Sequence, residues 1–130
     1  MNITQIKETS LYFKDLEKAH RFYHEILGFP LISYVKGKHI FFRAGASVLL
    51  CFNPADSRLK KSPPAHYSEG PYHFAFEVSA NEYESHKAEI ISKGIKIIDT
   101  LLWQSGKESF YFNDPEGNVL EIVPKGIWEK

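Results

Sequence analysis

The order of apolar and polar residues predicts strands and helices along the first half of the chain. Alternating or short apolar runs that are typical of strands occur at residues 8–13, 31–35, 39–44 and 47–52. Between the first two runs, apolar side chains recur at helical spacing from Leu16 to Leu27. Asp15 is placed as the N-cap of this helix, and Gly28 as the residue that ends it. The pattern predicts a β-α-β-β-β module at about residues 5–53.

The same order returns in the second half of the chain. The runs that predict strands are residues 73–78, 95–103, 108–112 and 118–123. Residues 79–94 predict a helix with a capping box formed by Ser79 and Glu82, and with Gly94 at its end. This second module covers about residues 72–124.

The segment between the modules, residues 54–71, is polar, proline-rich and without periodicity, so it is interpreted as a linker. A C-terminal tail at 125–130 follows the second module. Together the segments predict one domain spanning residues 1–130, because this length suits a single domain or two small modules that share a core.

Composition narrows the class of protein. Apolar residues make up 43% of the 130 residues and aromatic residues 15%, which is enough for a sizeable core. The formal net charge is zero, so the chain lacks the bulk attraction for nucleic acid or an anionic membrane. There is no apolar run of the roughly 20 residues that span a membrane. The N-terminus lacks the apolar core of a signal peptide. The lone cysteine, Cys51, predicts a packed thiol and fits a reducing cytoplasm.

One carboxylate lies where a buried strand is predicted. Glu121 is flanked on both sides by apolar residues, and it shares a strand face with Val119 and Val123. A buried carboxylate is costly unless a cation or strong donors hold it. The sequence leaves two interpretations open: Glu121 has a metal-binding or catalytic role, or a base neutralises it. The candidate bases are Lys7, Arg43 and Lys96.

The stretch NDPEGN before this strand predicts a type I turn. Asp114, Pro115 and Gly117 suit the first, second and fourth positions of that turn. Its contribution to function is expected to be indirect, because the turn fixes the register that decides which way Glu121 points.

Three motifs in order resemble one family. YFKDLEKAHRFYHEILGF is similar to the strand–helix opening of the vicinal oxygen chelate superfamily, GPYHFAFEV to the start of its second module, and SFYFNDPEGNVLEI to its closing hairpin. That superfamily includes glyoxalase I, bleomycin-resistance proteins, extradiol dioxygenases and fosfomycin-modifying enzymes. The motifs are most similar to those of the fosfomycin thiol transferases. The resemblance implies an α+β fold of two βαβββ modules forming a curved mixed sheet around one cleft, and a homodimer.

The resemblance also implies a set of site residues. Carried onto this chain, the metal-ligand positions are Glu8, His73 and Glu121, while Leu50 occupies a fourth position and cannot ligate. Tyr111 is the implied catalytic partner of Glu121. From the residues alone, a solvated Glu8, a structural His73 and a packed Tyr111 remain open. One histidine and two carboxylates suit Mn²⁺, Fe²⁺, Ni²⁺, Co²⁺ or Zn²⁺.

The chain departs from the fosfomycin thiol transferases in three ways. Glu8 replaces a histidine, the stretch at 103–109 is shorter than the loop that holds their monovalent cation, and no basic phosphonate pocket is recognisable. Two functions therefore stand beside each other. The first is a metal-dependent lyase, isomerase or transferase acting on a small oxygen-bearing substrate. The second is a metal-free protein that binds a small molecule or antibiotic. A third interpretation is a fold that has no active metal site.

Overall fold

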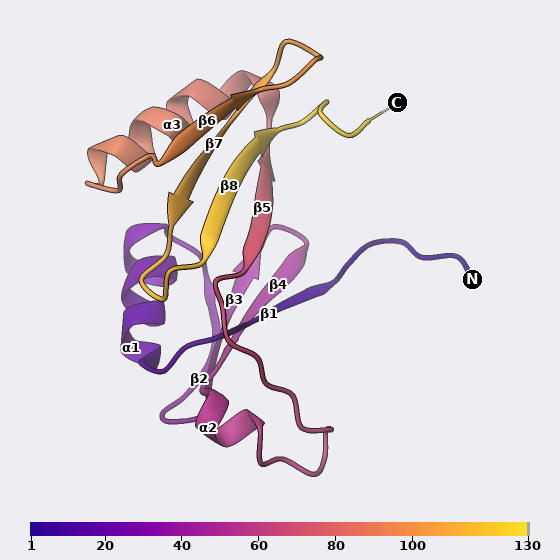
Figure 1. Ribbon diagram of the computed structural model, residues 1–130, viewed down its shortest axis with the longest axis vertical. Coiled ribbons are helices and arrows are strands. Elements are labelled where there is room, and N and C mark those ends of the chain that lie inside the picture. Colours follow the sequence, from indigo (N-terminus) through magenta and orange to yellow (C-terminus); the bar gives the residue numbers. More distant parts are fainter. Residues whose placement is uncertain (130) are drawn as a thin grey trace. The chain divides into compact units, whose positions relative to one another are not determined.

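Two four-stranded mixed sheets, each with its own helix, make up the fold. The computed structural model describes residues 1–129, and the chain divides into two units, one from Met1 to Gly70 and one that begins at Pro71 (Figure 1). Lys130, the last residue of the predicted tail, lies outside the described residues. Both units follow the β-α-β-β-β order, so the predicted α+β class and the repeated arrangement are confirmed.

The first sheet has the order β1-β4-β3-β2. Its strands are β1 (Glu8–Tyr12), β2 (Leu31–Val35), β3 (His39–Ala44) and β4 (Ser47–Phe52). β1 pairs with β4 in parallel, and the other pairs are antiparallel. Two parallel neighbours need a long crossover connection, and between β1 and β4 this connection consists of the helical segment and the β2–β3 hairpin.

The helical segment of the first unit begins where the sequence predicts but changes its winding. Asp15 caps α1 (Leu16–Ala19) by accepting a hydrogen bond from the Glu17 amide at 3.0 Å. The chain then continues as a π-helix, η1 (His20–Ile26), and ends at Gly28, whose φ is 79°. The winding itself was not predicted, because apolar spacing does not separate α from π over two turns.

The core of the first unit lies between this helical segment and one face of the sheet. Tyr23 is fully buried and packs against the rings of Phe13, Phe29 and Phe42 at centroid distances of 6.2, 5.9 and 5.6 Å. Cys51 is also fully buried and forms no disulfide, which confirms that it is a packed thiol.

The segment interpreted as a linker folds against the first unit. It begins with a short helix, α2 (Pro54–Ser57), whose N-cap Asn53 accepts from the Ala55 amide at 3.0 Å. Further along, the ring of His66 packs on Phe52 at 4.4 Å, and the Tyr12 hydroxyl lies 2.8 Å from its Nδ1. The segment is polar and proline-rich, yet aromatic contacts hold it to the face of the first sheet that carries Tyr12 and Phe52.

The second sheet has the order β5-β8-β7-β6. Its strands are β5 (His73–Val78), β6 (Asp99–Leu102), β7 (Glu108–Asn113) and β8 (Val119–Pro124). β5 pairs with β8 in parallel, and β7 pairs with β8 and β6 in antiparallel fashion. Strand β8 is therefore internal to the sheet, which places Glu121 between two hydrogen-bonded neighbours.

The predicted capping box of the second unit is wrong. The Ser79 side chain makes no capping hydrogen bond; instead the Ser79 carbonyl accepts from the Glu82 amide at 3.0 Å. This bond closes a 3₁₀ turn, η2 (Ala80–Glu82), and the α-helix α3 (Tyr83–Ser92) begins only after it. Ser79 thus precedes a 3₁₀ turn and not the first turn of the α-helix.

The two faces of the second sheet differ in character. The face toward α3 is apolar and aromatic, with Phe110, Phe112 and Leu120 fully buried and Tyr83 of α3 at 5.6 Å from the Phe110 ring. The opposite face carries His73, Tyr111 and Glu121, as the registers of β5, β7 and β8 require.

In the described part of the chain, no helix has the length and apolar character that a membrane span needs.

Candidate functional site

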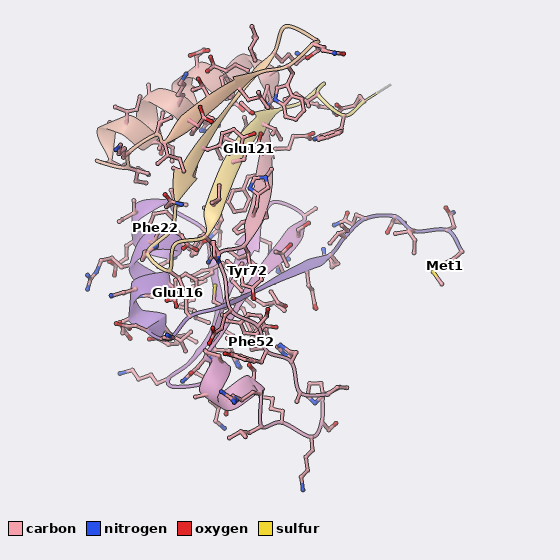
Figure 2. The ribbon with its side chains drawn as sticks, viewed as in Figure 1. Met1, Phe22, Phe52, Tyr72, Glu116 and Glu121 are labelled. Atoms are coloured by element: carbon pink, nitrogen blue, oxygen red, sulfur yellow. The ribbon has the colours of Figure 1, made fainter. Side chains whose placement is uncertain are left out.

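Glu121 is a buried carboxylate at the middle of the internal strand β8. It pairs with Ala75 of β5 on one side and with Tyr111 of β7 on the other, and only 5% of the residue is exposed (Figure 2). The prediction that Glu121 is buried in a strand is confirmed. Desolvation at such a position penalises a negative charge, so the surroundings of the carboxylate decide its role.

His73 lies against this carboxylate from the start of β5. Its Nε2 is 3.3 Å from Oε2 of Glu121, and the histidine side chain is 53% exposed whereas the glutamate side chain is 6% exposed. The parallel register explains the contact: His73 pairs with Val119, so Glu121 lies two residues further along on the same face. Among residues 71–129, the contact with His73 supplies the partner of Glu121, in preference to Lys96.

The other ring nitrogen of His73 determines its tautomer. Nδ1 lies 3.0 Å from the carbonyl oxygen of Val119. A carbonyl only accepts, so Nδ1 carries a proton and the neutral ring presents the lone pair of Nε2 toward Glu121. Two lone-pair atoms then face each other, which is unfavourable unless a proton or a cation lies between them.

The carboxylate of Glu121 has a further unsatisfied atom. Its Oε1 is buried and has no hydrogen-bond partner among the described residues. A buried acceptor left without a partner costs about 1–3 kcal/mol, and more when it is charged. The donor set therefore fits a cation: an imidazole nitrogen fixed by a backbone carbonyl, beside a carboxylate with free lone pairs.

Tyr111 lies next to this pair on β7. It is the direct cross-strand neighbour of Glu121, and its ring centroid is 5.9 Å from that of His73. Burial raises the pKa of the Tyr111 phenol, the Glu121 carboxylate raises it further, and the Ser109 hydroxyl lowers it. The phenol consequently keeps its proton at neutral pH and is available as a hydrogen-bond donor.

Glu8, the third predicted ligand, belongs to the first unit. It is the exposed first residue of β1 and pairs with Val48 of β4. Leu50, in the fourth position, is a buried apolar residue of β4. Within residues 1–129, no group of three or more His, Cys, Asp and Glu side chains is gathered to hold a metal ion. The second unit by itself supplies His73 and Glu121.

A buried polar network connects the predicted turn to the start of β5. Asp114 accepts from the amides of Glu116 and Asn118 at 2.9 and 3.0 Å, and the Gly117 amide donates to its carbonyl at 3.0 Å. A four-residue turn is thus formed at the predicted place. The Asn118 side chain donates to Asp114 at 2.8 Å and accepts from the Tyr72 amide at 3.0 Å. Tyr72 precedes His73, so this network positions the histidine.

The sequence analysis did not identify Asn118 as a site-supporting residue. Asn118 is only 1% exposed, although an asparagine after a Gly-containing turn is usually solvated. The available signal was its place at the junction of turn and strand, where an amide can bond to two chain segments at once.

The family model for the Glyoxalase/Bleomycin resistance protein/Dioxygenase superfamily matches residues 5–122. The chain belongs to this superfamily. The resemblance carried by the three sequence motifs is thereby confirmed, and the paired βαβββ units agree with it.

Two relatives in this superfamily cover nearly the whole chain. The glutathione transferase FosA of Serratia marcescens is 29% identical, over 92% of this chain and 80% of its own. The metallothiol transferase FosB of Lysinibacillus sphaericus (strain C3-41) is 27% identical, over 94% and 83%.

Solved structures agree with the fold of this superfamily member. The lactoylglutathione lyase of Agrobacterium tumefaciens is 29% identical, covers 100% of both chains and superimposes with a TM-score of 0.94. At the level of the fold alone, a point variant of the fosfomycin resistance protein FosX from Listeria monocytogenes is similar, with 20% identity over 94% of this chain and 90% of its own and a TM-score of 0.68. That protein was crystallised with Mn(II) and 1S,2S-dihydroxypropylphosphonic acid.

Proposed function

We propose that the protein is a divalent-metal-dependent enzyme of lyase, isomerase or thiol-transferase type that acts on a small oxygen-bearing substrate. The observation that carries the proposal is the His73–Glu121 pair, with Nε2 and Oε2 separated by 3.3 Å. Its imidazole is held by a backbone carbonyl, and Oε1 of its carboxylate is buried without a hydrogen bond. These are the properties of a pair prepared to bind a cation.

The ligands that the second unit supplies are Nε2 of His73 and a carboxylate oxygen of Glu121, and the family resemblance implies the carboxylate of Glu8 as the third. One nitrogen and two oxygens suit Mn²⁺, Fe²⁺, Ni²⁺, Co²⁺ or Zn²⁺. Three protein ligands leave coordination positions for water or substrate, as catalytic sites require. The FosX protein that shares the fold was crystallised with Mn(II), which is consistent with this choice.

A bound divalent cation would supply Lewis-acid polarisation of substrate oxygens. The residues of the chain have separate roles around it. Glu121 would accept a proton at its carboxylate. Tyr111 retains its proton, because burial and Glu121 raise its pKa, and donates a hydrogen bond to a substrate oxygen. The Val119 carbonyl keeps His73 in the tautomer that presents Nε2.

The names of the relatives support a thiol as the second substrate. They describe a glutathione transferase, a metallothiol transferase and a lactoylglutathione lyase. We therefore propose that the substrate is a small oxygenated molecule that reacts with a thiol or is already bonded to one.

The test begins with metal content and thermal stability. Protein purified without chelator is expected to hold a stoichiometric transition metal, and Mn²⁺, Ni²⁺ or Zn²⁺ is expected to raise the melting temperature of the apoprotein. The variants His73→Ala, Glu121→Gln and Glu8→Gln should each reduce this rise. Glu77→Gln, an exposed carboxylate of β5 on the same sheet face, is the matched control. An apoprotein whose melting temperature is the same with and without these metals contradicts the proposal.

A metal-free protein that binds a small molecule or antibiotic is the second candidate. The buried Leu50 favours it, because an apolar side chain occupies the fourth family position. A ligand that stabilises the apoprotein without turnover supports this function, whereas metal-dependent turnover of a substrate contradicts it.

We further propose that the protein is a cytoplasmic homodimer, as the family resemblance implies. Multi-angle light scattering measures the mass directly. A mass of one chain across the working concentration range overturns the proposal of a dimer.

A further inference from the structure

A second group of metal-ligating side chains lies in the first unit, on the π-helix η1. π-helices are rare in proteins and occur frequently at functional sites. In η1 the Leu27 amide donates to the Phe22 carbonyl at 2.9 Å, which is the five-residue spacing of this winding. The wider turn brings residues four and five positions apart over one another. His20 is consequently a neighbour of both His24 and Glu25.

The two histidines are stacked. Their ring centroids are 5.3 Å apart, and the rings are inclined by only 22°. The ring of Tyr34 from β2 packs against His20 at 5.6 Å, and the Tyr34 hydroxyl donates to Glu17. His20 is thus restricted on two sides, yet its side chain remains 25% exposed and accessible to an ion.

The Nδ1 of each histidine lies toward an oxygen atom, and in His24 it is within hydrogen-bond distance. Nδ1 of His24 lies 2.7 Å from the Phe29 carbonyl oxygen, which fixes the proton on that nitrogen. Nδ1 of His20 lies 3.8 Å from Oε1 of Glu25. Backbone carbonyls and carboxylates are the usual outer partners of metal-ligating histidines. The proton on Nδ1 leaves the lone pair of His24 on Nε2, and Nε2 is the nitrogen of His20 that does not face Glu25.

Tyr34 does not compete as a ligand. Burial raises its pKa to about 12, and Glu17 and Asp15 add to the shift, so the phenol stays protonated at neutral pH. The available donors are the two imidazoles. Imidazole nitrogen suits Cu²⁺, Ni²⁺ and Zn²⁺, whereas Mg²⁺ and Mn²⁺ prefer oxygen ligands.

We propose that His20 and His24 chelate a divalent transition metal of the Cu²⁺, Ni²⁺ and Zn²⁺ class through their Nε2 atoms, at a site separate in sequence and in ligands from His73 and Glu121. Water completes the coordination. Two protein ligands give a site that takes up and releases its ion readily, unlike a closed structural site with four. Binding also holds η1 in the π winding, because both ligands must stay on one side of the turn.

The test is a calorimetric titration of the double variant His73→Ala/Glu121→Gln with Cu²⁺, since that background lacks the ligands of the proposed first site. Saturable binding of one ion per chain is expected. Adding His24→Ala should weaken it by about tenfold or more. His86→Ala is the matched control, because His86 of α3 has a carboxylate partner, Glu89 at 3.5 Å, but is not paired with a second histidine among the described residues. This control should leave the affinity unchanged.

The electron paramagnetic resonance spectrum of the Cu²⁺ complex should show two coordinated imidazole nitrogens, and one nitrogen after His20→Ala. The circular dichroism spectrum of each variant checks that it is folded. If one of the His20 and His24 variants fails to fold, the other replaces it in the test. The proposal is overturned if the double variant binds no ion saturably, or if His24→Ala and His86→Ala weaken binding equally. If the proposed metal site at His73 and Glu121 is wrong, this test still holds, because the background variant already lacks those two ligands.

Discussion

The imidazole of His73 and the carboxylate of Glu121 face each other at 3.3 Å while the other nitrogen of the imidazole is bonded to the Val119 carbonyl. In a pair of this kind, Nε2 of the imidazole is directed at a carboxylate that is largely buried. We therefore expect a single substitution in this pair to raise the stability of the apoprotein and to lower its affinity for a cation.

Glu121→Gln is the substitution that separates the stability of the apoprotein from its affinity for a metal. An amide can donate to Nε2 of His73 and carries no charge, so the apoprotein should be more stable than the wild type by about 1 kcal/mol. The gain in melting temperature on adding Ni²⁺ or Zn²⁺ should be lost in the same variant. Urea denaturation with and without metal measures both effects. A variant that is less stable without metal, or that keeps the full metal response, contradicts the prediction.

Asn118→Ala should destabilise the second unit and weaken metal binding. It removes the hydrogen bonds that Asn118 makes with the Tyr72 amide and with one oxygen of Asp114, and each such bond contributes about 0.5–1.5 kcal/mol. The His73 ring is then less well positioned. Equilibrium unfolding and metal titration report the two consequences. Asn81→Ala, in the exposed 3₁₀ turn η2, is the control and should change neither quantity.

The Lys87–Glu108 pair should contribute to stability in a pH-dependent manner. Lys87 Nζ lies 2.5 Å from the Glu108 carboxylate, and this hydrogen bond, with help from Tyr83, holds the pKa of Glu108 below its ordinary value. The folded state thus favours the ionised form, so the contribution is present above the unfolded pKa of about 4.3 and is lost as the pH falls through the folded pKa. Glu108 is 35% exposed, and such pairs contribute about 0.2–1 kcal/mol.

The measurement is the free energy of unfolding as a function of pH for the wild type, Lys87→Met, Glu108→Gln and the double variant. The coupling energy from this cycle should be favourable at neutral pH and vanish in acid. A coupling that is the same at both pH values would show that charge is not its source.

His39 should titrate below the ordinary histidine range. It is stacked on Phe41 at 4.0 Å, and burial, followed by the charge of Lys60, lowers its pKa. Because the folded pKa is depressed, the stability that neutral His39 provides is complete above about pH 6.5 and is lost as the pH falls through the folded pKa. Lys60→Met should raise the pKa, measured by the NMR shift of the His39 ring proton. Lys36→Met is the control and should leave it in place.

The alternation and periodicity of the chain were sufficient to predict the strands. The observed β2, β3, β4 and β5 coincide with the predicted runs, because their apolar pattern is strong and short turns bound them. β6 is shorter than predicted: residues 95–98 have the same apolar character, but the pairing with β7 begins only at Asp99. Local pattern does not specify where a partner strand starts.

Local chemistry determined the turn at Asp114 and Gly117, the cap at Asp15 and the burial of Cys51 and Glu121, because each follows from the residue and its immediate neighbours. Tertiary structure decided which side chains from distant segments are in contact. The parallel register of β5 and β8 joins His73 to Glu121 across 48 positions of the sequence. Nothing local distinguishes that partner from Lys96. The same is true of Asn118, whose two bonds exist only when turn and strand are folded together, and of the π winding that brings His20 beside Glu25. Side-chain types and spacing fix which groups can be buried, whereas pairing between distant segments fixes which of them are satisfied by one another.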